Sequence, residues 1–355
     1  MKQIKLMKGN EALAEAAIRC GCDAYFGYPI TPQSEVLEYL SANAHKRTGM
    51  VVLQAESEVA SINMVYGAAG TGKRIMTSSS SPGISLMQEG ISYIACVELP
   101  CLIVNVNRGG PGLGTIQPAQ GDYFQSVKGG GHGDYKLIVL APSSVQETVD
   151  FVDLSFDLAF KYRNPVLILS DGALGQMMEK VELPVQKERT FTELDWATTG
   201  RKKGNGRVIT SLNLQPEKME EINIHLQKKY REIEKNEIRF ETVNCDDADY
   251  IITGYGLVAR ICQKAAQLAH DKGIKVGVIR PITLFPFPYK TYFEIADEVK
   301  GILDVEMNAG QMVEDVRLGV NGKTKVEFHG RMGGIIPTPE EILEALEKKL
   351  IGGKR

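Results

Sequence analysis

Short apolar runs alternate with helix-period segments over residues 1 to about 185. Parallel strands need a crossover, usually helical, between them, and strands buried on both faces read as nearly continuous apolar runs. The pattern therefore predicts an α/β protein with a mostly parallel sheet that helices cover on both faces. Six runs fit this description: "AYFGYP", "MVVLQA", "RIMTSS", "CLIVNVNR", "YKLIVLAP" and "PVLILSD".

The alternation of apolar runs and helix-period segments stops after this first region and later returns. Residues 186–238 contain the loop-like "KKGNGR" and the strongly charged "EKMEEINIHLQKKYREIEKNEIRFE", which predict a linker with a helix on the surface. The alternation returns from residue 239 with "DYIITGYG", "IKVGVIRPITLFPFP" and "GILDVEMNAGQM". We therefore expect a first α/β domain at 1–185, a linker at 186–238 and a smaller α/β domain at 239–355.

The charge balance and the length of the apolar runs limit which partners are expected. The chain has 41 Lys and Arg residues against 44 Asp and Glu residues, which gives no reason to expect a basic face or a nucleic-acid partner. No apolar run is long enough to span a bilayer, so no membrane partner is expected. The first residues lack the apolar core of a signal peptide, and free thiols suit a reducing compartment, so we expect a cytoplasmic location.

The six cysteines form no CxxC pair and no Cys/His group with zinc spacing. The closely spaced cysteines that hold an iron–sulfur cluster are also missing. If the protein handles electrons, the metal centres are expected elsewhere, and no metal ligand is assigned to this chain.

Two glycine-rich segments imitate nucleotide-binding motifs. In "GAAGTGKR", Arg74 replaces the hydroxyl residue of a P-loop, and a helix precedes the segment where a strand should. In "ITGYGLVA", the acidic residue expected about twenty positions later is absent. We interpret both segments as structural turns. A nucleotide-binding or regulatory module without catalysis stays open as the alternative function.

Three features at predicted strand ends could carry chemistry. In Tyr28-Pro29-Ile30-Thr31-Pro32, Thr31 could be a helix N-cap with Pro32 at the first helical position, or the helix start could bind an anion. Glu58 opens the next helix, where it either complements the helix dipole or is buried and needs a partner. Arg108 precedes "GGPGLG" and is either solvated or placed to clamp a carboxylate. Together they predict a site for a small anionic molecule.

Several stretches carry a family resemblance. "FGYPITPQSE", "QAESEVASINMVYGAAGTGKR" and "SPGISLMQEGISYIACVELPCLIVNVNRGGPGLGT" resemble the alpha-type subunit of 2-oxoacid:ferredoxin oxidoreductases, as do "VIRPITLFPFP", "VEMNAGQM" and "HGRMGGIIPTPEEI". The resemblance covers nearly the whole chain and is greatest to the 2-oxoisovalerate (branched-chain) branch. It implies a pyrimidine-binding domain of the thiamine diphosphate type at 1–185 and a transketolase-C-terminal-like domain at 239–355.

The activity that the resemblance implies is oxidative decarboxylation of a 2-oxoacid. Thiamine diphosphate attacks the 2-oxo carbon, carbon dioxide leaves, and the acyl group passes to coenzyme A as co-substrate. The electrons pass through [4Fe-4S] clusters to ferredoxin. The cofactor carries the hard chemistry, and the protein orients and tunes it.

The resemblance also assigns roles to residues. Glu58 matches the glutamate that bonds a ring nitrogen of the cofactor's aminopyrimidine. Thr31 matches the threonine that contacts the substrate, and Arg108 matches the arginine near its carboxylate. Ile30 is expected beside the substrate, and Tyr28 and Pro29 are expected to shape the pocket around the thiamine.

The half-site for the diphosphate is not recognisable in this chain. "SDGALGQ" and "GDYF" both depart from the Gly-Asp-Gly signature with its later Asn. The resemblance therefore implies a beta subunit that binds the diphosphate and Mg²⁺. A gamma subunit and a small ferredoxin-like subunit are expected as further partners, with the [4Fe-4S] clusters on partner subunits.

Overall fold

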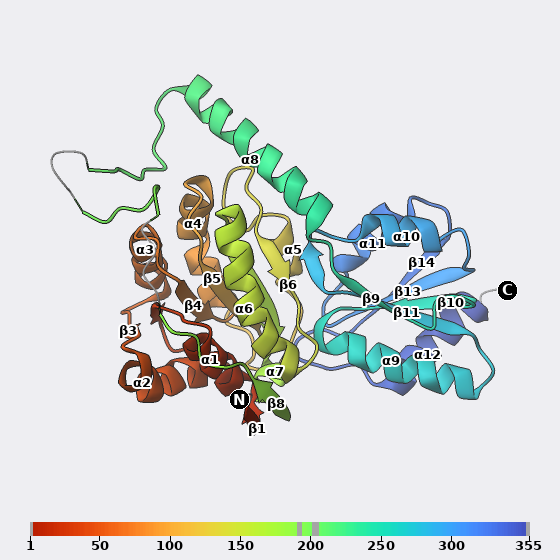
Figure 1. Ribbon diagram of the computed structural model, residues 1–355. Coiled ribbons are helices and arrows are strands. Elements are labelled where there is room, and N and C mark those ends of the chain that lie inside the picture. Colours follow the sequence, from red (N-terminus) through yellow and green to blue (C-terminus); the bar gives the residue numbers. More distant parts are fainter. Residues whose placement is uncertain (1–2, 190–193, 201–205, 353–355) are drawn as a thin grey trace.

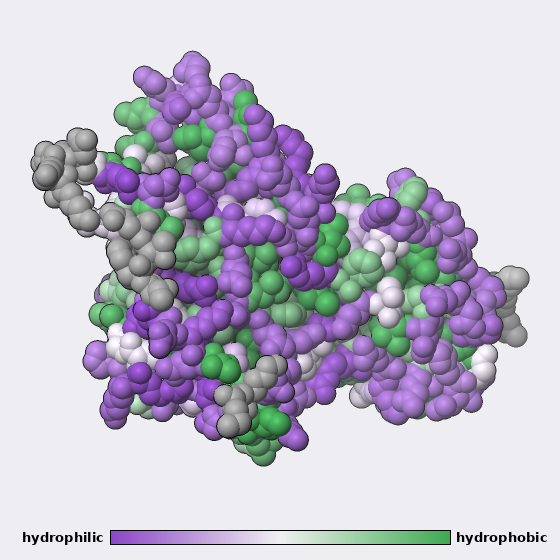
Figure 2. Space-filling model, viewed as in Figure 1, coloured by the Kyte–Doolittle hydropathy of each residue, from purple (hydrophilic) through white to green (hydrophobic). Residues whose placement is uncertain are grey.

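The computed structural model describes residues 3–189, 194–200 and 206–352. Two sheets and a two-stranded ribbon form its framework (Figure 1). No helix within these ranges is both long and apolar enough to cross a membrane. Figure 2 shows hydrophilic side chains over most of the visible face, including the long helix α8, Pro216–Asn236, at the top.

A seven-stranded sheet organises the N-terminal part, in the order β12-β6-β7-β5-β4-β2-β3. All its neighbours pair in parallel except β12, which is antiparallel to β6. The six apolar runs each supply one strand, so the predicted α/β fold with a mostly parallel sheet is confirmed. The strands are β2 Ala24–Gly27, β3 Val51–Gln54, β4 Ile75–Ser79, β5 Leu102–Asn107, β6 Ile138–Leu140, β7 Val166–Asp171 and β12 Thr283–Phe285.

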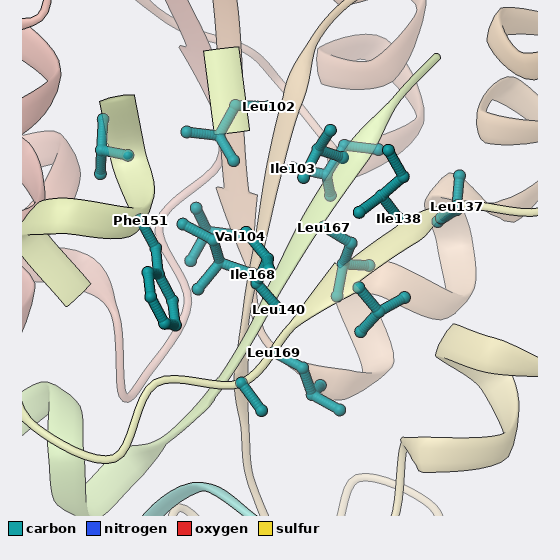
Figure 3. Packing of buried hydrophobic residues seen from close by; sticks show 14 of the residues in the cluster. Leu102, Ile103, Val104, Leu137, Ile138, Leu140, Phe151, Leu167, Ile168 and Leu169 are labelled. Atoms are coloured by element: carbon teal, nitrogen blue, oxygen red, sulfur yellow. The ribbon is translucent and has the colours of Figure 1, made fainter. Parts of the chain in front are cut away.

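Helices pack against this sheet in two groups. Helix α1 lies against α2 and α6, and α3 lies against α4. The close crossing of α3 and α4 depends on Gly90, because a Cβ there would lie 2.6 Å from a methyl carbon of Ile62. Figure 3 shows the core beside the central strands, where Ile103, Val104 and Ile168 are fully buried. The helices are α1 Gly9–Arg19, α2 Ser34–Thr48, α3 Glu58–Ala69, α4 Ser81–Cys96, α5 Tyr123–Val127, α6 Val145–Tyr162 and α7 Gly172–Gln176.

A five-stranded sheet, in the order β14-β13-β10-β11-β9, organises the C-terminal part. Its strands pair in parallel except for β9, an antiparallel edge strand. Helix α9 packs against α12, and α10 packs against α11. The elements are β9 Phe240–Val243, β10 Tyr250–Thr253, α9 Gly256–Asp271, β11 Val276–Pro281, α10 Tyr289–Ile295, β13 Gly301–Glu306, α11 Met312–Val320, β14 Lys325–Gly330, α12 Pro339–Leu346 and a π-helical turn Glu347–Ile351.

Strand β12 joins the two parts. It follows β11 in the chain, yet it pairs with β6 of the first sheet, and the Ala141 N–H donates to the Ile282 carbonyl at 2.8 Å. Nearby, the buried Arg280 of β11 donates to the carboxylate of Glu147 at the start of α6. The first sheet is thus completed by β12, which comes after β9, β10 and β11 of the second sheet in the chain. The segment boundaries given above remain a prediction.

The sequence pattern did not indicate the ribbon of β1, Gln3–Lys8, and β8, Met178–Leu183. Its outer face carries the exposed apolar side chains of Ile4, Leu6 and Met178 among charged residues. Helix α8 forms within the charged segment and buries only Leu226, Tyr230 and Ile233. A narrow apolar stripe is therefore enough to hold a helix whose other faces are hydrophilic.

The two glycine-rich segments both form turns. Helix α3 ends at Ala69 and β4 begins at Ile75, with Gly72 at a φ of +77° between them, so a helix precedes and a strand follows. In the second segment, a Cβ on Gly254 would lie 3.1 Å from the carbonyl oxygen of Val305, so the glycine is needed for packing. Neither geometry favours a nucleotide-binding module.

Candidate functional site

The predicted site residues follow strands β2, β3 and β5, which end at one edge of the seven-stranded sheet. Tyr28–Pro32 follow β2, Glu58 follows β3 and Arg108 follows β5. Carboxyl ends of parallel strands meet at the same edge of a sheet, and open α/β sheets bind their ligands there. The topology therefore places all three features at the edge where a ligand is expected.

Arg108 links two of the loops at this edge. Its side chain is buried, its Nη1 donates to the carbonyl oxygen of Thr31 at 2.8 Å, and its Nη2 donates to the carbonyl oxygen of Leu113 at 3.0 Å. Its Nε is buried and has no hydrogen-bond partner among the described residues. Arg108 is therefore not a solvated surface arginine, and the positive charge stays within the site.

Thr31 is not the N-cap of a helix, and this alternative from the sequence is wrong. Helix α2 begins at Ser34 with Gln33 in the cap position. The chain first makes a turn in which the Gln33 N–H donates to the Ile30 carbonyl at 3.0 Å, and the Gln33 side chain is buried and accepts from the Ser78 hydroxyl at 2.6 Å. Pro32 therefore precedes the helix, and the exposed Thr31 side chain bonds no described residue.

Glu58 is the first residue of α3, and its side chain is only 5% exposed. It packs against α4 at a point where only glycine fits, because a Cβ on Gly83 would lie 2.5 Å from Oε1 of Glu58 and 2.1 Å from Oγ of Ser79. No residue of the described ranges donates a hydrogen bond to its carboxylate. Glu56, two residues earlier, is exposed. Burial thus distinguishes the two glutamates of this segment.

Hydroxyl groups line the strand end beside Glu58. Ser79 and Ser80 are fully buried, and their Oγ atoms, like Oγ1 of Thr77, have no hydrogen-bond partner among the described residues. Buried polar groups are normally paired, so an unpaired cluster in a native protein calls for an explanation. The cluster makes this strand end polar although it is enclosed.

The remaining predicted residues surround this edge. Tyr28, Pro29 and Ile30 are half-buried at the end of β2. The structure brings Thr31 and Arg108 into contact, whereas no hydrogen bond or ion pair of the described residues joins Glu58 to either of them.

A cleft of about 410 Å³ opens beside Arg108, between the N-terminal and C-terminal parts. Two polar residues that line it, Ser81 and Asp122, were not predicted from the sequence. Burial raises the pKa of the Asp122 carboxyl, and hydrogen bonds from Ser81 and Asn105 oppose the shift. The serine run "TSSSSPG" after an apolar run could have indicated Ser81, and Asp122 stands out in the sequence only as part of a glycine motif. The C-terminal part contributes Met307, Asn308, Ala309, Gln311, Met332 and Gly333 to the lining.

The described residues fit the pyrimidine half of a thiamine site. A buried carboxylate without a protein donor is free to accept a hydrogen bond from a ring nitrogen. Asp171, in the segment "SDGALGQ", is used differently, because it caps α7 by accepting from the N–H groups of Ala173 and Leu174 at 2.9 and 3.1 Å. Burial raises its pKa to about 6. No group of three potential metal ligands lies within the described ranges.

Fold and site together define a two-part α/β protein of the thiamine-enzyme class, with a buried acid at the ligand edge of its first sheet. Residues 15–244 match the family described as pyruvate flavodoxin/ferredoxin oxidoreductase, thiamine diphosphate-binding. Residues 248–342 match core domain II of pyruvate:ferredoxin oxidoreductase. The chain therefore belongs to the 2-oxoacid:ferredoxin oxidoreductases, as an alpha-type subunit, and the expected family is confirmed.

Individual relatives agree with this placement. The chain is 48% identical over 344 residues to ketoisovalerate oxidoreductase subunit VorB of Methanothermobacter thermautotrophicus, covering 97% of each chain. The 2-oxoglutarate:ferredoxin oxidoreductase of Magnetococcus marinus, solved with 2-oxoglutarate, coenzyme A and succinyl-CoA, superposes with a TM-score of 0.86 at 28% identity. That match covers 98% of this chain and 66% of the other. A split-gene transketolase shares the fold, with a TM-score of 0.61 at 14% identity over 97% and 98% of the two chains.

Proposed function

We propose that this chain supplies the pyrimidine-binding half of a thiamine diphosphate-dependent oxidoreductase that converts a branched-chain 2-oxoacid and coenzyme A to acyl-CoA and carbon dioxide and reduces ferredoxin. The observation that carries the proposal is the Glu58 carboxylate. It is 5% exposed, stands at a helix start beside Gly83, and accepts no hydrogen bond from any described residue. The residue is buried as a whole, yet its carboxylate oxygens are not among the enclosed atoms, so a ligand donor can reach them.

Glu58 acts as the acid–base group of the site. When bound, thiamine diphosphate supplies the carbon nucleophile for the 2-oxo group and accepts the negative charge left by decarboxylation. With the cofactor bound, the Glu58 carboxylate would accept a hydrogen bond from a ring nitrogen of the aminopyrimidine and would take up or return that proton. The start of α3 favours negative charge at this position, and the wall formed by Gly83 keeps the carboxylate in one orientation. Tyr28 and Pro29 shape the pocket from the end of β2.

Thr31 and Arg108 hold the 2-oxoacid. The Thr31 hydroxyl is exposed and bonds no described residue, so it is available to a substrate oxygen. Arg108 uses one hydrogen of Nη1 and one of Nη2 on two backbone carbonyls, which leaves its charge and the second hydrogen of each Nη for the substrate carboxylate. Ile30 gives the turn an apolar side chain beside them.

The substrate class follows from charge. A dicarboxylic acid such as 2-oxoglutarate needs a second cation for its far carboxylate, whereas a branched-chain 2-oxoacid needs an apolar surface. Arg108 is the one cationic side chain among the described residues that line the cleft, and Met307, Ala309 and Met332 are apolar. The relative with 48% identity is named for ketoisovalerate. Both observations support 2-oxoisovalerate as the substrate.

The complete enzyme requires other chains. Relatives are named as subunits, which supports a hetero-oligomer. We assign the diphosphate and Mg²⁺ to a beta subunit and the [4Fe-4S] clusters to partner subunits. A gamma subunit and a small ferredoxin-like subunit would complete the complex, in the cytoplasm.

The test compares Glu58→Gln with Glu56→Gln in the co-purified complex, using viologen dye reduction with 2-oxoisovalerate, pyruvate, 2-oxoglutarate and an aryl 2-oxoacid. Loss of a general acid–base group costs about 100-fold or more in rate, so Glu58→Gln should lose at least that much. Glu56→Gln, exposed and two residues away, should stay within about twofold of wild type. Substantial activity in Glu58→Gln would refute the assignment, and a preference for 2-oxoglutarate would refute the substrate class.

A further inference from the structure

We propose that Ser81 and Asp122 are positioning residues that set the place of Arg108 and, through it, of Thr31. This inference rests on the proposed function, because it assigns to Ser81 and Asp122, which line the cleft, a role that acts through Arg108. The hydrogen bonds concerned lead from Asp122 and Ser81 in the cleft, through Arg108, to Thr31 in the turn that follows β2.

Ser81 is the centre of the arrangement. Its Oγ accepts a hydrogen bond from the Arg108 backbone N–H at 3.0 Å and lies 2.6 Å from Oδ2 of Asp122. A hydroxyl has one proton to donate and can accept at the same time. The hydroxyl donates its proton to Asp122, its shortest contact. Asp122 therefore fixes the hydroxyl in the orientation that accepts from the Arg108 N–H.

Asp122 is itself held in place. Asn105 of β5 donates from Nδ2 to Oδ2 of Asp122 at 2.8 Å, and its Oδ1 accepts from the Ser81 backbone N–H at 3.1 Å. Ser81 is 8% exposed, and Asn105 is fully buried. Hydrogen bonds to a carboxylate in such surroundings are among the stronger ones in proteins, so the three side chains form a rigid unit.

The unit acts on Arg108 rather than on its own helix. Ser81 is the first residue of α4, yet its hydroxyl bonds Asp122 and the end of β5, and no side-chain hydrogen bond caps α4. A hydroxyl that served only the helix start would accept from an N–H of the next turn. Its contacts instead fix the backbone of Arg108, from which the guanidinium extends to the Thr31 carbonyl at 2.8 Å.

The consequence is that two loops depend on Ser81, which belongs to neither of them. The turn after β2 and the glycine loop after β5 are both tied to the guanidinium, through Thr31 and Leu113. Loosening Ser81 should therefore release both. Because a misplacement of about 1 Å can lower catalysis about 100-fold, a positioning residue can matter as much as a contact residue.

The test uses Ser81→Ala and Asp122→Asn in the full chain and in the complex. Ser85→Ala is the matched control, since Ser85 lies one turn further along α4, where its hydroxyl donates to the Ser81 carbonyl and accepts from Gln125 but does not bond Arg108 or Asp122. Hydrogen exchange of peptides covering residues 28–36 and 108–117 reports loop order without any reference to activity. We expect faster exchange in both peptides for Ser81→Ala, a smaller effect for Asp122→Asn, and none for Ser85→Ala.

Kinetics of the complex provide the second measurement. Ser81→Ala should lower kcat/KM for the 2-oxoacid by about 10- to 100-fold. In an Arg108→Lys background the same substitution should change kcat/KM by less than about threefold, because residues that act as one unit are not additive. Additive losses, or unchanged exchange at residues 28–36 in Ser81→Ala, would overturn the inference. Failure of the wild-type complex to oxidise any 2-oxoacid would instead refute the proposed function, and the exchange experiment would still decide the positioning role.

Discussion

Arg108 Nη1 lies 2.8 Å from the main-chain carbonyl oxygen of Thr31, and no described residue bonds the Thr31 side chain. The arginine thus fixes the backbone of the threonine and leaves its hydroxyl available. The two residues stand 77 positions apart in the chain. Their contact explains how a short exposed turn can present one hydroxyl in a defined place.

Thr31→Val should separate function from stability. Thr31 caps no helix, so the free energy of unfolding should change by less than about 0.5 kcal/mol. Activity of the complex should nevertheless fall through a higher KM or a lower kcat. Thr338→Val is the matched control, because Thr338 forms a capping box with Glu341 and its loss should cost about 1 kcal/mol. Urea unfolding and dye reduction check both variants, and a stability loss in Thr31→Val equal to that of Thr338→Val would contradict the prediction.

Gly83→Ala should disturb the Glu58 pocket. The added Cβ would fall 2.1 Å from Ser79 Oγ and 2.5 Å from Glu58 Oε1, so we expect a loss of about 1–3 kcal/mol together with most of the activity. Gly67→Ala is the comparison, because a Cβ added to this exposed glycine of α3 would meet nothing within 4 Å and should gain about 0.5–1 kcal/mol. Thermal unfolding of the two variants measures the difference. Equal shifts would mean that the wall beside Glu58 is not tight.

Asp304 should make stability depend on pH. Burial, together with the negative charge of nearby Glu306, raises its pKa well above the usual range, while Arg317 opposes the shift. The folded protein therefore keeps a proton that the unfolded chain releases above a pH of about 4, so this residue's contribution to stability declines as the pH rises. Asp304→Asn does not ionise, and its stability relative to wild type should increase between pH 5 and pH 8 in urea unfolding. A difference that is constant with pH would contradict the argument.

Thiamine diphosphate should bind the complex but not the isolated chain. The site on this chain offers an acceptor for the pyrimidine, and the diphosphate half is assigned to a beta subunit. Calorimetry of the isolated chain with thiamine diphosphate and Mg²⁺ should show no binding at micromolar concentrations. The co-purified complex is the positive control, and micromolar binding by the isolated chain would contradict the shared site.

The sequence was enough to predict the α/β architecture, because buried parallel strands leave continuous apolar runs such as those of β5 and β7. It did not indicate β12, since Thr283–Phe285 lie in a Pro-rich stretch and become a strand only by pairing with β6. Glu58 could be proposed from its neighbours, but its burial could be known only from the contact with Gly83. The sequence around Thr31 fits an N-cap as well as it fits the observed turn. The turn places Gln33 at the cap instead, where its side chain bonds Ser78 of β4, and this contact cannot be seen in the sequence.

The late position of β12 in the chain has a consequence for synthesis on the ribosome. Strand β6 keeps an open edge until Phe285 has emerged, because its antiparallel neighbour is encoded after β11. Unpaired edges favour aggregation, so the nascent N-terminal sheet is exposed to it while α8, β9, β10 and α9 are being translated. A chain cut between residues 244 and 248, where the two matched families meet, would keep that edge open permanently. Halves of this subunit are therefore poor candidates for separate expression.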